Sequence, residues 1–439
     1  MDLFDKEVWA LIMFAVLMLA LLIGYPVAFT LGAVSLLFGG VFLGFGFFEL
    51  LPMRIWGIMT NFTLLAVPLF VFMGIILEKS GLAEDLLETM GSLFGSLRGG
   101  LAISIIIVGA LLAAATGVVG ATVVTMGIIA LPSLLKNGYS PSLATGVIAT
   151  SGTLGQIIPP SIILILLADM IGVPVGRLFL GAVMPGLLLV GLYLFYVIIK
   201  AWLDPKSAPT LNTNVQISWQ RIIKTVLPVL TLIFAVLGTI FFGIATPTES
   251  AAFGAVGALI LSYQRLSLQT LQIAMQHTIR LTSMVFLILI GATAFGLVFR
   301  WMGGDQLLHE ILTQLPGGAW GFMLISLLII FILGFFLDFL EICFIVVPIL
   351  APIAEFFQID LLWFAVLIAV NLQTSFLTPP FGFSLFYLKA VAPPNIKITT
   401  IYKGIIPFVI LQLIGLILLV LFPNITLWLP NLVDNWLEL

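Results

Sequence analysis

Long runs of apolar residues, separated by short polar stretches, make up most of the chain. A membrane-spanning helix needs about 20 apolar residues, and fewer where helices pack at an angle. The pattern therefore predicts an all-α polytopic membrane protein. Simple spans are expected at 8–23, 26–45, 54–77, 175–200, 222–242, 248–263, 279–300 and 399–422. Amphipathic or polar stretches lie at 78–98, 267–276 and 303–314, and the first is expected to lie along the membrane interface.

Two apolar runs, 101–135 and 319–353, are too long for a single span. About 35 residues at 1.5 Å each form a helix of roughly 50 Å, well beyond the thickness of a bilayer. Turn-like residues at 116–122 interrupt the first run, and Asp338 and Glu341 interrupt the second. We predict that each run is a re-entrant helical hairpin with its tip near the middle of the membrane.

Two further apolar segments, 142–172 and 361–391, each contain a double proline, Pro159-Pro160 and Pro379-Pro380. A proline inside a helix removes a backbone hydrogen bond and clashes with the preceding turn, so two in succession end the helix. Broken helices at membrane depth are buried in protein or line a wet cavity. We therefore predict two broken spans that border a binding site.

The two halves of the chain contain these segments in the same order. The double prolines lie about 220 residues apart, and other Gly and Pro positions keep that offset, which indicates an internal duplication. A hairpin returns to its own side, so each half crosses the membrane five times, and the odd number inverts the second half. The predicted organisation is a first inverted repeat at 1–200, a linker at 201–220, a second inverted repeat at 221–422 and a C-terminal tail at 423–439.

Positive residues mark the cytoplasmic side of a membrane protein. Four basic residues between 200 and 224 flank the linker, which places the linker in the cytoplasm and both termini in the periplasm. In an alternative topology the double-proline segments are the hairpins. The number of crossings keeps its parity, but Lys136 moves outside the cell and Glu355 and Asp360 move inside. The first arrangement is preferred on this charge pattern.

Composition limits the classes of function. Hydrophobic residues make up 62% of the chain and charged residues 8%, with a mean hydropathy of +1.29, so little soluble mass is expected. One cysteine and two histidines argue against a transition-metal or haem site. No nucleotide-binding or hydrolase motif and no basic patch for nucleic acid occurs. An acidic start before the first apolar run is expected to precede a retained span rather than form a signal peptide.

Each helix break frees backbone groups for binding. The N-terminus of a half-helix suits an anion, whereas free carbonyl oxygens suit a hard cation such as Na⁺. Polar side chains gather around the breaks and tips, namely Thr116, Thr122, Thr125, Ser151, Thr153, Gln156, Asn371, Gln373, Thr374, Ser375, Thr378 and Ser384. Such residues also permit close helix packing, and that interpretation is preferred for an isolated serine. For the Gly-Thr-Leu-Gly-Gln sequence before Pro159 a binding role is preferred.

Several carboxylates lie within or beside the predicted spans. Asp338 and Glu341 are one helical turn apart at the second tip, and intramembrane carboxylates are costly and usually functional. The alternative is a tip that reaches the headgroups and is simply hydrated. Glu249 is expected to be a helix-start carboxylate with a structural role. Asp169 and Arg177 are expected to pair with each other near a helix end.

At these residues the chain resembles the large membrane subunit of tripartite ATP-independent periplasmic (TRAP) transporters, the DctM-like family of the ion transporter superfamily. Four stretches carry the resemblance along nearly the whole chain. They are the run from Phe62 to Phe70, Gly152-Thr-Leu-Gly-Gln-Ile-Ile-Pro-Pro-Ser161, Gly243-Ile-Ala-Thr-Pro-Thr-Glu249, and Leu337-Asp338 ahead of Val347-Pro-Ile-Leu-Ala-Pro352.

The resemblance implies a sodium symporter, not an enzyme, that works by an elevator motion of the hairpins and broken spans against a scaffold. It implies two partners, a small four-span membrane subunit and a periplasmic substrate-binding protein that delivers an organic anion. It also implies a multi-pass location in the bacterial inner (cytoplasmic) membrane, with Na⁺ as coupling ion and no cofactor. The sodium and substrate site is then predicted to include Thr116, Gly117, Gly120, Thr122, Ser151, Gly152, Thr153, Gly155, Gln156, Pro159, Pro160, Asp338, Glu341, Asn371, Thr374, Ser375, Thr378, Pro379, Pro380 and Gly382.

The chain departs from the family pattern at both tips. Many members have a Ser-Gly-Ser-like first tip, whereas this chain has Thr116-Gly-Val-Val-Gly120, and many follow the second-tip Asp with small residues, whereas this chain has Phe339-Leu-Glu341. Phe339-Leu-Glu341, together with the sequence from Asn371 to Gly382, resembles a branch associated with 2-oxo acids, lactate-like monocarboxylates or mannitol and haloaromatic acids. A mono- or 2-oxocarboxylate is therefore predicted in preference to sialic acid or a C4-dicarboxylate.

Three other functions are alternatives for the same sequence. A stand-alone ion-coupled carboxylate carrier or antiporter of similar build differs mainly in working without a binding protein. A membrane-embedded enzyme would need catalytic groups at a defined depth, and only Asp338 and Glu341 qualify. A channel is disfavoured, because two closed hairpins around a duplicated central site suit alternating access.

Overall fold

Helices make up nearly all of the structure, a computed structural model that describes residues 6–117, 119–210 and 219–437. No strand occurs within these ranges. Six of their helices are long and apolar enough to cross a membrane, or seven if one bent pair is counted as a single span. The prediction of an all-α polytopic membrane protein is thus confirmed.

The chain begins with five helices: α1 (Lys6–Leu22), α2 (Val27–Phe42), α3 (Phe45–Met59), α4 (Ala66–Lys79) and α5 (Leu82–Phe94). The expected single span at 54–77 is wrong, because the chain bends by 56° between α3 and α4. The Asn61 side chain accepts a hydrogen bond from the Thr63 amide at 2.9 Å and so replaces a helical bond. Thr248 donates to the Phe62 carbonyl at 2.7 Å and holds the turn from outside.

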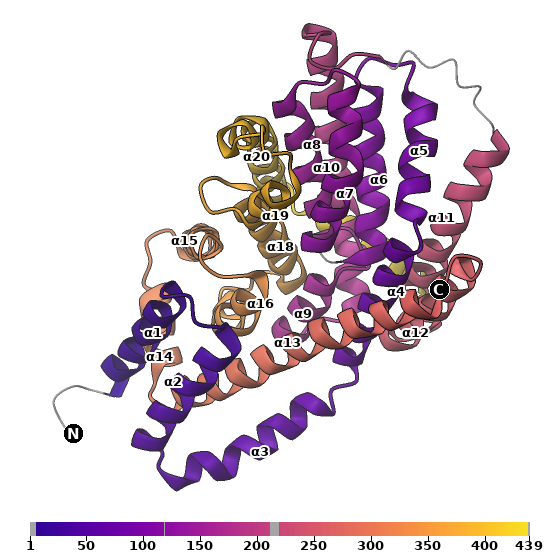
Figure 1. Ribbon diagram of the computed structural model, residues 1–439. Helices are drawn as coiled ribbons and strands as arrows, with labels where there is room; N and C mark the ends of the chain where they lie inside the picture. The colour runs from indigo at the N-terminus through magenta and orange to yellow at the C-terminus, as the bar shows by residue number, and fades with distance from the viewer. Residues whose placement is uncertain (1–5, 118, 211–218, 438–439) are drawn as a thin grey trace.

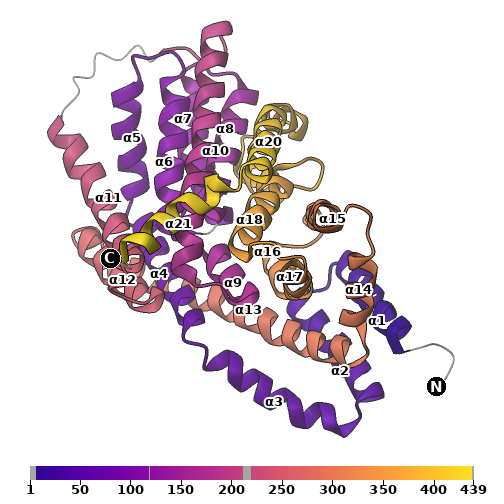
Figure 2. The same cartoon turned by 180° about the vertical axis from the view of Figure 1, so that it is seen from behind.

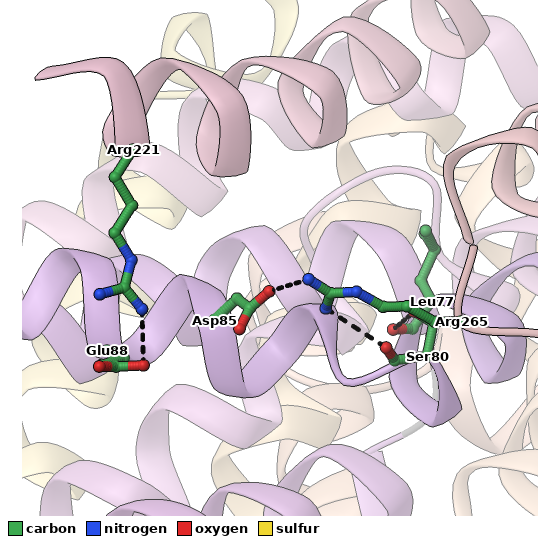
Figure 3. A network of polar contacts seen from close by, with 6 residues as sticks. All are labelled: Leu77, Ser80, Asp85, Glu88, Arg221 and Arg265. Atoms are coloured by element: carbon green, nitrogen blue, oxygen red, sulfur yellow. Dashed lines mark hydrogen bonds and ion pairs between the residues drawn. The ribbon is translucent and has the colours of Figure 1, made fainter. Parts of the chain in front are cut away.

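Charged contacts link α5 to the second half of the chain (Figure 3). Its Leu86 and Leu87 are buried, and the helix packs against α6. Arg221 pairs with Glu88 at 2.7 Å, and Arg265 pairs with Asp85 and also donates to the Ser80 carbonyl. The two arginines belong to the second half of the chain, so α5 is fixed between the halves.

The overlong run 101–135 forms two helices, α6 (Gly100–Thr116) and α7 (Val119–Lys136), that pack side by side. They meet at Gly117, whose φ of +61° is a left-handed conformation that favours glycine. The next segment is α8 (Pro141–Thr153), the 3₁₀ turn η2 (Leu154–Gln156) and α9 (Ile162–Ile171), which leads away from α8 (Figure 1).

α10 (Val175–Leu203) closes the first half and extends three residues into the expected linker. Beyond it Ser207 and Ala208 are buried, and their carbonyls accept from Ser140 and Gly99 at 3.0 Å each. The start of the linker is therefore packed against the first turns of α6 and α8. Lys200 donates to Asp204 at 3.2 Å, which lowers the pKa of that carboxyl below its ordinary value. Linker residues 211–218 lie outside the described ranges.

The second half starts with α11 (Trp219–Phe241), α12 (Pro247–Ser262), α13 (Leu268–Trp301) and α14 (Gly304–Thr313). Glu249 closes a capping box with Thr246 at the start of α12, as predicted. The separate segments expected at 267–276 and 279–300 are instead the single 34-residue helix α13. Ser267 caps its start, and no proline interrupts it, so the change from polar to apolar residues does not break the helix.

The overlong run 319–353 forms α15 (Gly318–Leu333), followed after five residues by α16 (Phe339–Glu341), the π turn η3 (Ile342–Val346) and α17 (Val347–Phe356). Next come α18 (Leu361–Leu377), α19 (Phe383–Val391) and α20 (Ile398–Leu421). In Figures 1 and 2, α6, α7, α8 and α10 stand together, while α13 crosses beneath them toward α14.

Residues 423–439, expected only as a tail, contain helix α21 (Asn424–Leu437), which packs along α10 (Figure 2). Asp434 of α21 pairs with Arg177 at 2.8 Å. The predicted pair of Asp169 and Arg177 is therefore wrong. Asp169 instead accepts a hydrogen bond from Asn61 at 2.8 Å, which links α9 to the turn between α3 and α4.

Candidate functional site

The first double proline ends the helical segment that consists of α8 and η2. Ser140 caps α8, and Pro141 occupies its first turn. The break at Pro159-Pro160, a cis peptide, separates η2 from α9. Ser161 bridges the break, because its hydroxyl donates to the Gln156 carbonyl at 2.9 Å.

The second double proline lies in a corresponding environment. α18 ends at Leu377, and Pro379-Pro380, also cis, precedes α19. The Ser384 hydroxyl donates to the Phe376 carbonyl at 2.8 Å, and the Tyr402 hydroxyl donates to the Pro380 carbonyl at 2.9 Å. At each break a serine hydroxyl therefore donates to a backbone carbonyl. That carbonyl has no helical N–H partner, because the residue four positions later is a proline.

α8 and α18 meet at a hydrogen bond between the two halves. Gln373 Nε2 donates to Thr153 Oγ1 at 3.4 Å, and the two residues are 220 positions apart. That separation equals the offset between the double prolines, from 159 to 379. Two positions that the predicted duplication relates to each other are therefore in direct contact.

Gln156 has an unusual environment for an amide side chain. It is fully buried beside the first break, and neither Oε1 nor Nε2 has a hydrogen-bond partner among the described residues. Gln373 Oε1 also lacks one. Burying an amide without a partner costs about 1–3 kcal/mol by mutational data. These atoms are consequently available to a bound ion, water or substrate group.

The tip between α6 and α7 lies against the first break. A Cβ added to Gly117 would be 3.5 Å from the Pro160 carbonyl oxygen, and one added to Gly120 would be 3.3 Å from the Tyr387 ring of α19. Thr122 is buried on α7. The Thr116 side chain and residue 118 lie outside the part of the chain that the structure describes, so the predicted role of Thr116 stays a prediction.

The tip between α15 and α17 carries the two carboxylates. Asp338 accepts from the Phe339 amide at 2.7 Å, and Glu341 accepts from the Asp338 amide at 2.6 Å, the reciprocal pattern of a capping box. Glu341 is 5% exposed. In the described part of the chain no basic side chain pairs with either carboxylate. Two carboxylates, of which Glu341 is buried and Asp338 is half-buried, thus share one helix start with no basic partner among the described residues.

Most other predicted polar residues satisfy their hydroxyls locally. Hydroxyl groups of α8 and α18 donate to carbonyls three or four residues earlier, in Ser151, Thr153, Thr374, Ser375 and Thr378. Asn371 donates to the Leu327 carbonyl of α15 at 2.7 Å. Their oxygen atoms retain acceptor capacity, but the donated bonds also suit the packing interpretation.

Glycines bring the tips and breaks close together. A Cβ on Gly152 would lie 2.4 Å from Val123, and one on Gly155 would lie 3.5 Å from Ala113. In the second half a Cβ on Gly334, beside the tip, would lie 2.2 Å from Ser375 Oγ of α18, whereas one on Gly382 would lie 2.5 Å from the Phe376 carbonyl oxygen within the same break. Each tip therefore contacts the break of its own half, with little space for larger side chains.

Sequence reasoning missed three participants in this region. Tyr387 covers Gly120, Asn61 binds Asp169, and Glu78 accepts from Thr125 at 3.0 Å. Asn61 could have been noticed as a polar residue directly before the apolar run at Phe62. Tyr387 gave no such signal, because aromatic residues are common throughout the chain.

The arrangement can hold a cation and an anion without a transition metal. The described residues contain no group of three or more His, Cys, Asp and Glu side chains that could bind a metal ion. Carboxylate, carbonyl and amide oxygens at the tips and breaks are the ligands that hard cations prefer. The first N–H groups of a helix have no partner earlier in that helix, so the starts of α9 and α19 suit a carboxylate.

Comparison with known proteins gives consistent matches. The family model described as tripartite ATP-independent periplasmic transporter, DctM component, matches residues 12–425. The chain is 32% identical over 374 residues to the C4-dicarboxylate TRAP transporter large permease protein DctM of Pseudomonas aeruginosa, with 84% of this chain and 87% of that protein covered. It is 30% identical to the sialic acid TRAP transporter large permease protein SiaM of Vibrio cholerae, with 93% and 95% covered.

Among solved structures, the YdaH transporter of Alcanivorax borkumensis has a similar fold. The TM-score is 0.66 at 13% sequence identity, and the match covers 94% of this chain and 99% of that one. At this identity the likeness concerns the fold alone.

Proposed function

The chain belongs to the DctM family of TRAP transporters and is a large permease subunit rather than an enzyme, and from this membership we propose that it imports an organic anion together with sodium. The observation that carries the sodium coupling is the pair Asp338 and Glu341. Glu341 is buried and Asp338 is half-buried, and a carboxylate pair of this kind, with no basic partner among the described residues, would be stabilised by a bound cation.

The proposed mechanism is alternating access by an elevator motion. The recurrence of paired helices, broken helix and long helix in both halves supports two inverted repeats, at 1–200 and 221–422, each with about five spans. In this proposal α6–α9 and α15–α19 form the moving unit, and the remaining helices form the scaffold. The contact between Thr153 and Gln373 supports a site on the axis that relates the repeats.

For the substrate we propose a carboxylate, with a 2-oxo or monocarboxylic acid as the specific class. Two relatives are named for C4-dicarboxylate and sialic acid. The preference for a smaller acid rests on the residues Phe339-Leu-Glu341 and on the sequence from Asn371 to Gly382. The anion would lie at the free N–H groups beside the double prolines, next to the cation.

We further propose the partners and location that the family implies. A small four-span membrane subunit would pair with the chain, and a periplasmic binding protein would deliver the anion. The chain would lie in the bacterial inner membrane with both termini in the periplasm and the linker in the cytoplasm, as the basic residues around the linker support.

Reconstitution tests the proposal directly. The chain is purified with a four-span subunit and a binding protein encoded beside it, placed in proteoliposomes, and supplied with the ligand that the binding protein retains. We expect uptake that requires both a sodium gradient and the binding protein. Uptake undiminished when choline replaces sodium, at constant pH and membrane potential, would overturn the sodium coupling.

A stand-alone carrier or antiporter is the second candidate, because paired hairpins and broken helices of this kind also suit a carrier that works without a binding protein. The same proteoliposomes separate the two candidates. Full uptake by this chain without a binding protein would support the stand-alone carrier and contradict the tripartite one.

A further inference from the structure

A cavity of about 530 Å³ lies between α13, α14 and the η3–α17 segment. None of the residues predicted for the sodium and substrate site lines it. Figure 2 shows α17 beside α14, above the C-terminal part of α13. The cavity is thus separate from the predicted site and lies between the second hairpin and α13–α14, and its volume is typical of a small-molecule site.

Two apolar helix faces form the walls of the cavity. One is the face of η3 and α17 that carries Phe344, Ile345, Pro348, Ile349, Pro352 and Ile353, at helical spacing. The other is the face of α13 that carries Leu289, Ala292, Phe295, Gly296 and Phe299. Two facing apolar surfaces of this kind suit an apolar ligand.

One end of the cavity is polar and carries charges of both signs. Arg300, Asp305, Gln306, His309 and Glu310 lie where α13 passes into α14. Arg300 Nε donates to the Gly296 carbonyl at 3.2 Å, and the guanidinium forms no ion pair with the described acidic residues. His309 packs edge-on against Phe356, with the ring centres 5.1 Å apart. A cation and two carboxylates therefore face the same opening.

The length of the cavity along α13 suits one acyl chain of a lipid. From Leu289 to Arg300 the helix rises about 16 Å at 1.5 Å per residue. This matches roughly half of a bilayer's hydrocarbon core, the depth of one leaflet. The charged end lies where α13 ends and α14 begins, and a lipid headgroup would lie there if its acyl chain followed α13.

We propose that this cavity binds a zwitterionic glycerophospholipid. One acyl chain occupies the space between α13 and α17, the phosphate lies at Arg300, and the ammonium group lies at Asp305 and Glu310. A phospholipid with a purely anionic headgroup would meet two carboxylates and a single guanidinium, so the charges favour a headgroup that itself carries both signs. The lipid would fill the space between the second hairpin and the long helix beside it.

The test measures lipid retention by the purified full chain. The protein is delipidated in detergent, supplied with equal amounts of phosphatidylethanolamine and phosphatidylglycerol, and examined by native mass spectrometry. We expect one phosphatidylethanolamine to be retained in preference to phosphatidylglycerol. Equal retention of both lipids, or retention of neither, would overturn the proposal.

A filling variant locates the bound lipid. Only the Arg300 guanidinium, at 3.8 Å, lies within 4 Å of a Cβ on Gly296, so Gly296→Leu fits into the cavity. Loss of room for about two methylenes should weaken retention roughly tenfold. The matched control is Gly238→Leu on α11, where a Cβ meets nothing within 4 Å and the cavity is absent. Equal retention by both variants, with unchanged gel-filtration profiles, would contradict this location.

A charge variant tests the headgroup assignment. Asp305→Asn with Glu310→Gln removes the two carboxylates, and we expect the preference to shift toward phosphatidylglycerol. An unchanged preference would contradict the proposed contact with the ammonium group. These measurements follow binding and not uptake, so their outcome is independent of whether transport requires sodium.

Discussion

Replacing Asp338 by Asn separates the two roles that this side chain can have. As a helix cap, Asp338 accepts from the Phe339 amide at 2.7 Å. Asn accepts the same bond and ranks with Asp as a cap, so the variant should fold with a stability within about 0.5 kcal/mol of the original. As part of a cation site, however, Asp338 contributes a charge that Asn lacks.

The expected loss of cation binding follows from the geometry. Glu341 accepts from the backbone amide of Asp338 at 2.6 Å, so the two carboxylates share one tip. A charge pair about 4 Å apart is worth about 4 kcal/mol at an effective dielectric constant near 20. Partial compensation reduces this, and a loss of about 2–3 kcal/mol corresponds to sodium binding weaker by roughly 30- to 150-fold.

The assay is the rise in thermal unfolding temperature of the purified chain as sodium replaces choline at constant ionic strength. We expect the Asp338→Asn variant to need roughly 30-fold or more sodium for the same rise. Glu249→Gln is the matched control, because Glu249 belongs to a capping box of the same type at the start of α12 but is exposed. An Asp338→Asn variant with the original sodium response would refute the cation site and leave Asp338 as a cap.

Three further predictions follow from individual contacts. Gln156→Leu removes two amide atoms that lack hydrogen-bond partners, so we expect the ligand-free chain to be more stable by about 1–3 kcal/mol and uptake to be slower. Thermal unfolding and uptake in proteoliposomes measure these effects, and a lower stability would contradict the expectation. Gly334→Ala should destabilise by about 1–3 kcal/mol, because its Cβ would lie 2.2 Å from Ser375 Oγ, and Ser375→Gly in the same chain should restore stability. Asn61→Leu removes the bonds to Asp169 and Thr63 and should cost about 1–3 kcal/mol by thermal unfolding, whereas a stability equal to that of the original chain would show these bonds to be unimportant.

The length of apolar runs and the double prolines predicted much of the fold. The overlong run 101–135 contains two helices, and the helix that starts at α8 ends before Pro159-Pro160. Both expectations depend on local chemistry, since about 35 apolar residues exceed one span and a proline pair ends a helix wherever it occurs.

The errors arose where distant residues decide the local structure. The turn between α3 and α4 is held in part by Thr248, which lies 186 residues from Phe62 in sequence. Arg177 pairs with Asp434 of α21 rather than with the nearby Asp169. For the candidate site, sequence placed Gln156 beside a break, but only the packing around it reveals that its amide atoms lack partners.

The continuous helix α13 has a mechanical consequence. Its 34 residues extend about 51 Å, which exceeds the thickness of about 40–45 Å of a bilayer with its headgroups, so this single helix is long enough to cross the whole membrane. An uninterrupted helix of this length resists bending, so it acts as a stiff beam against which α2 and α4 pack. Any relative movement would then take place as sliding along the sides of this beam, with flexion confined to its ends at Ser267 and Gly303.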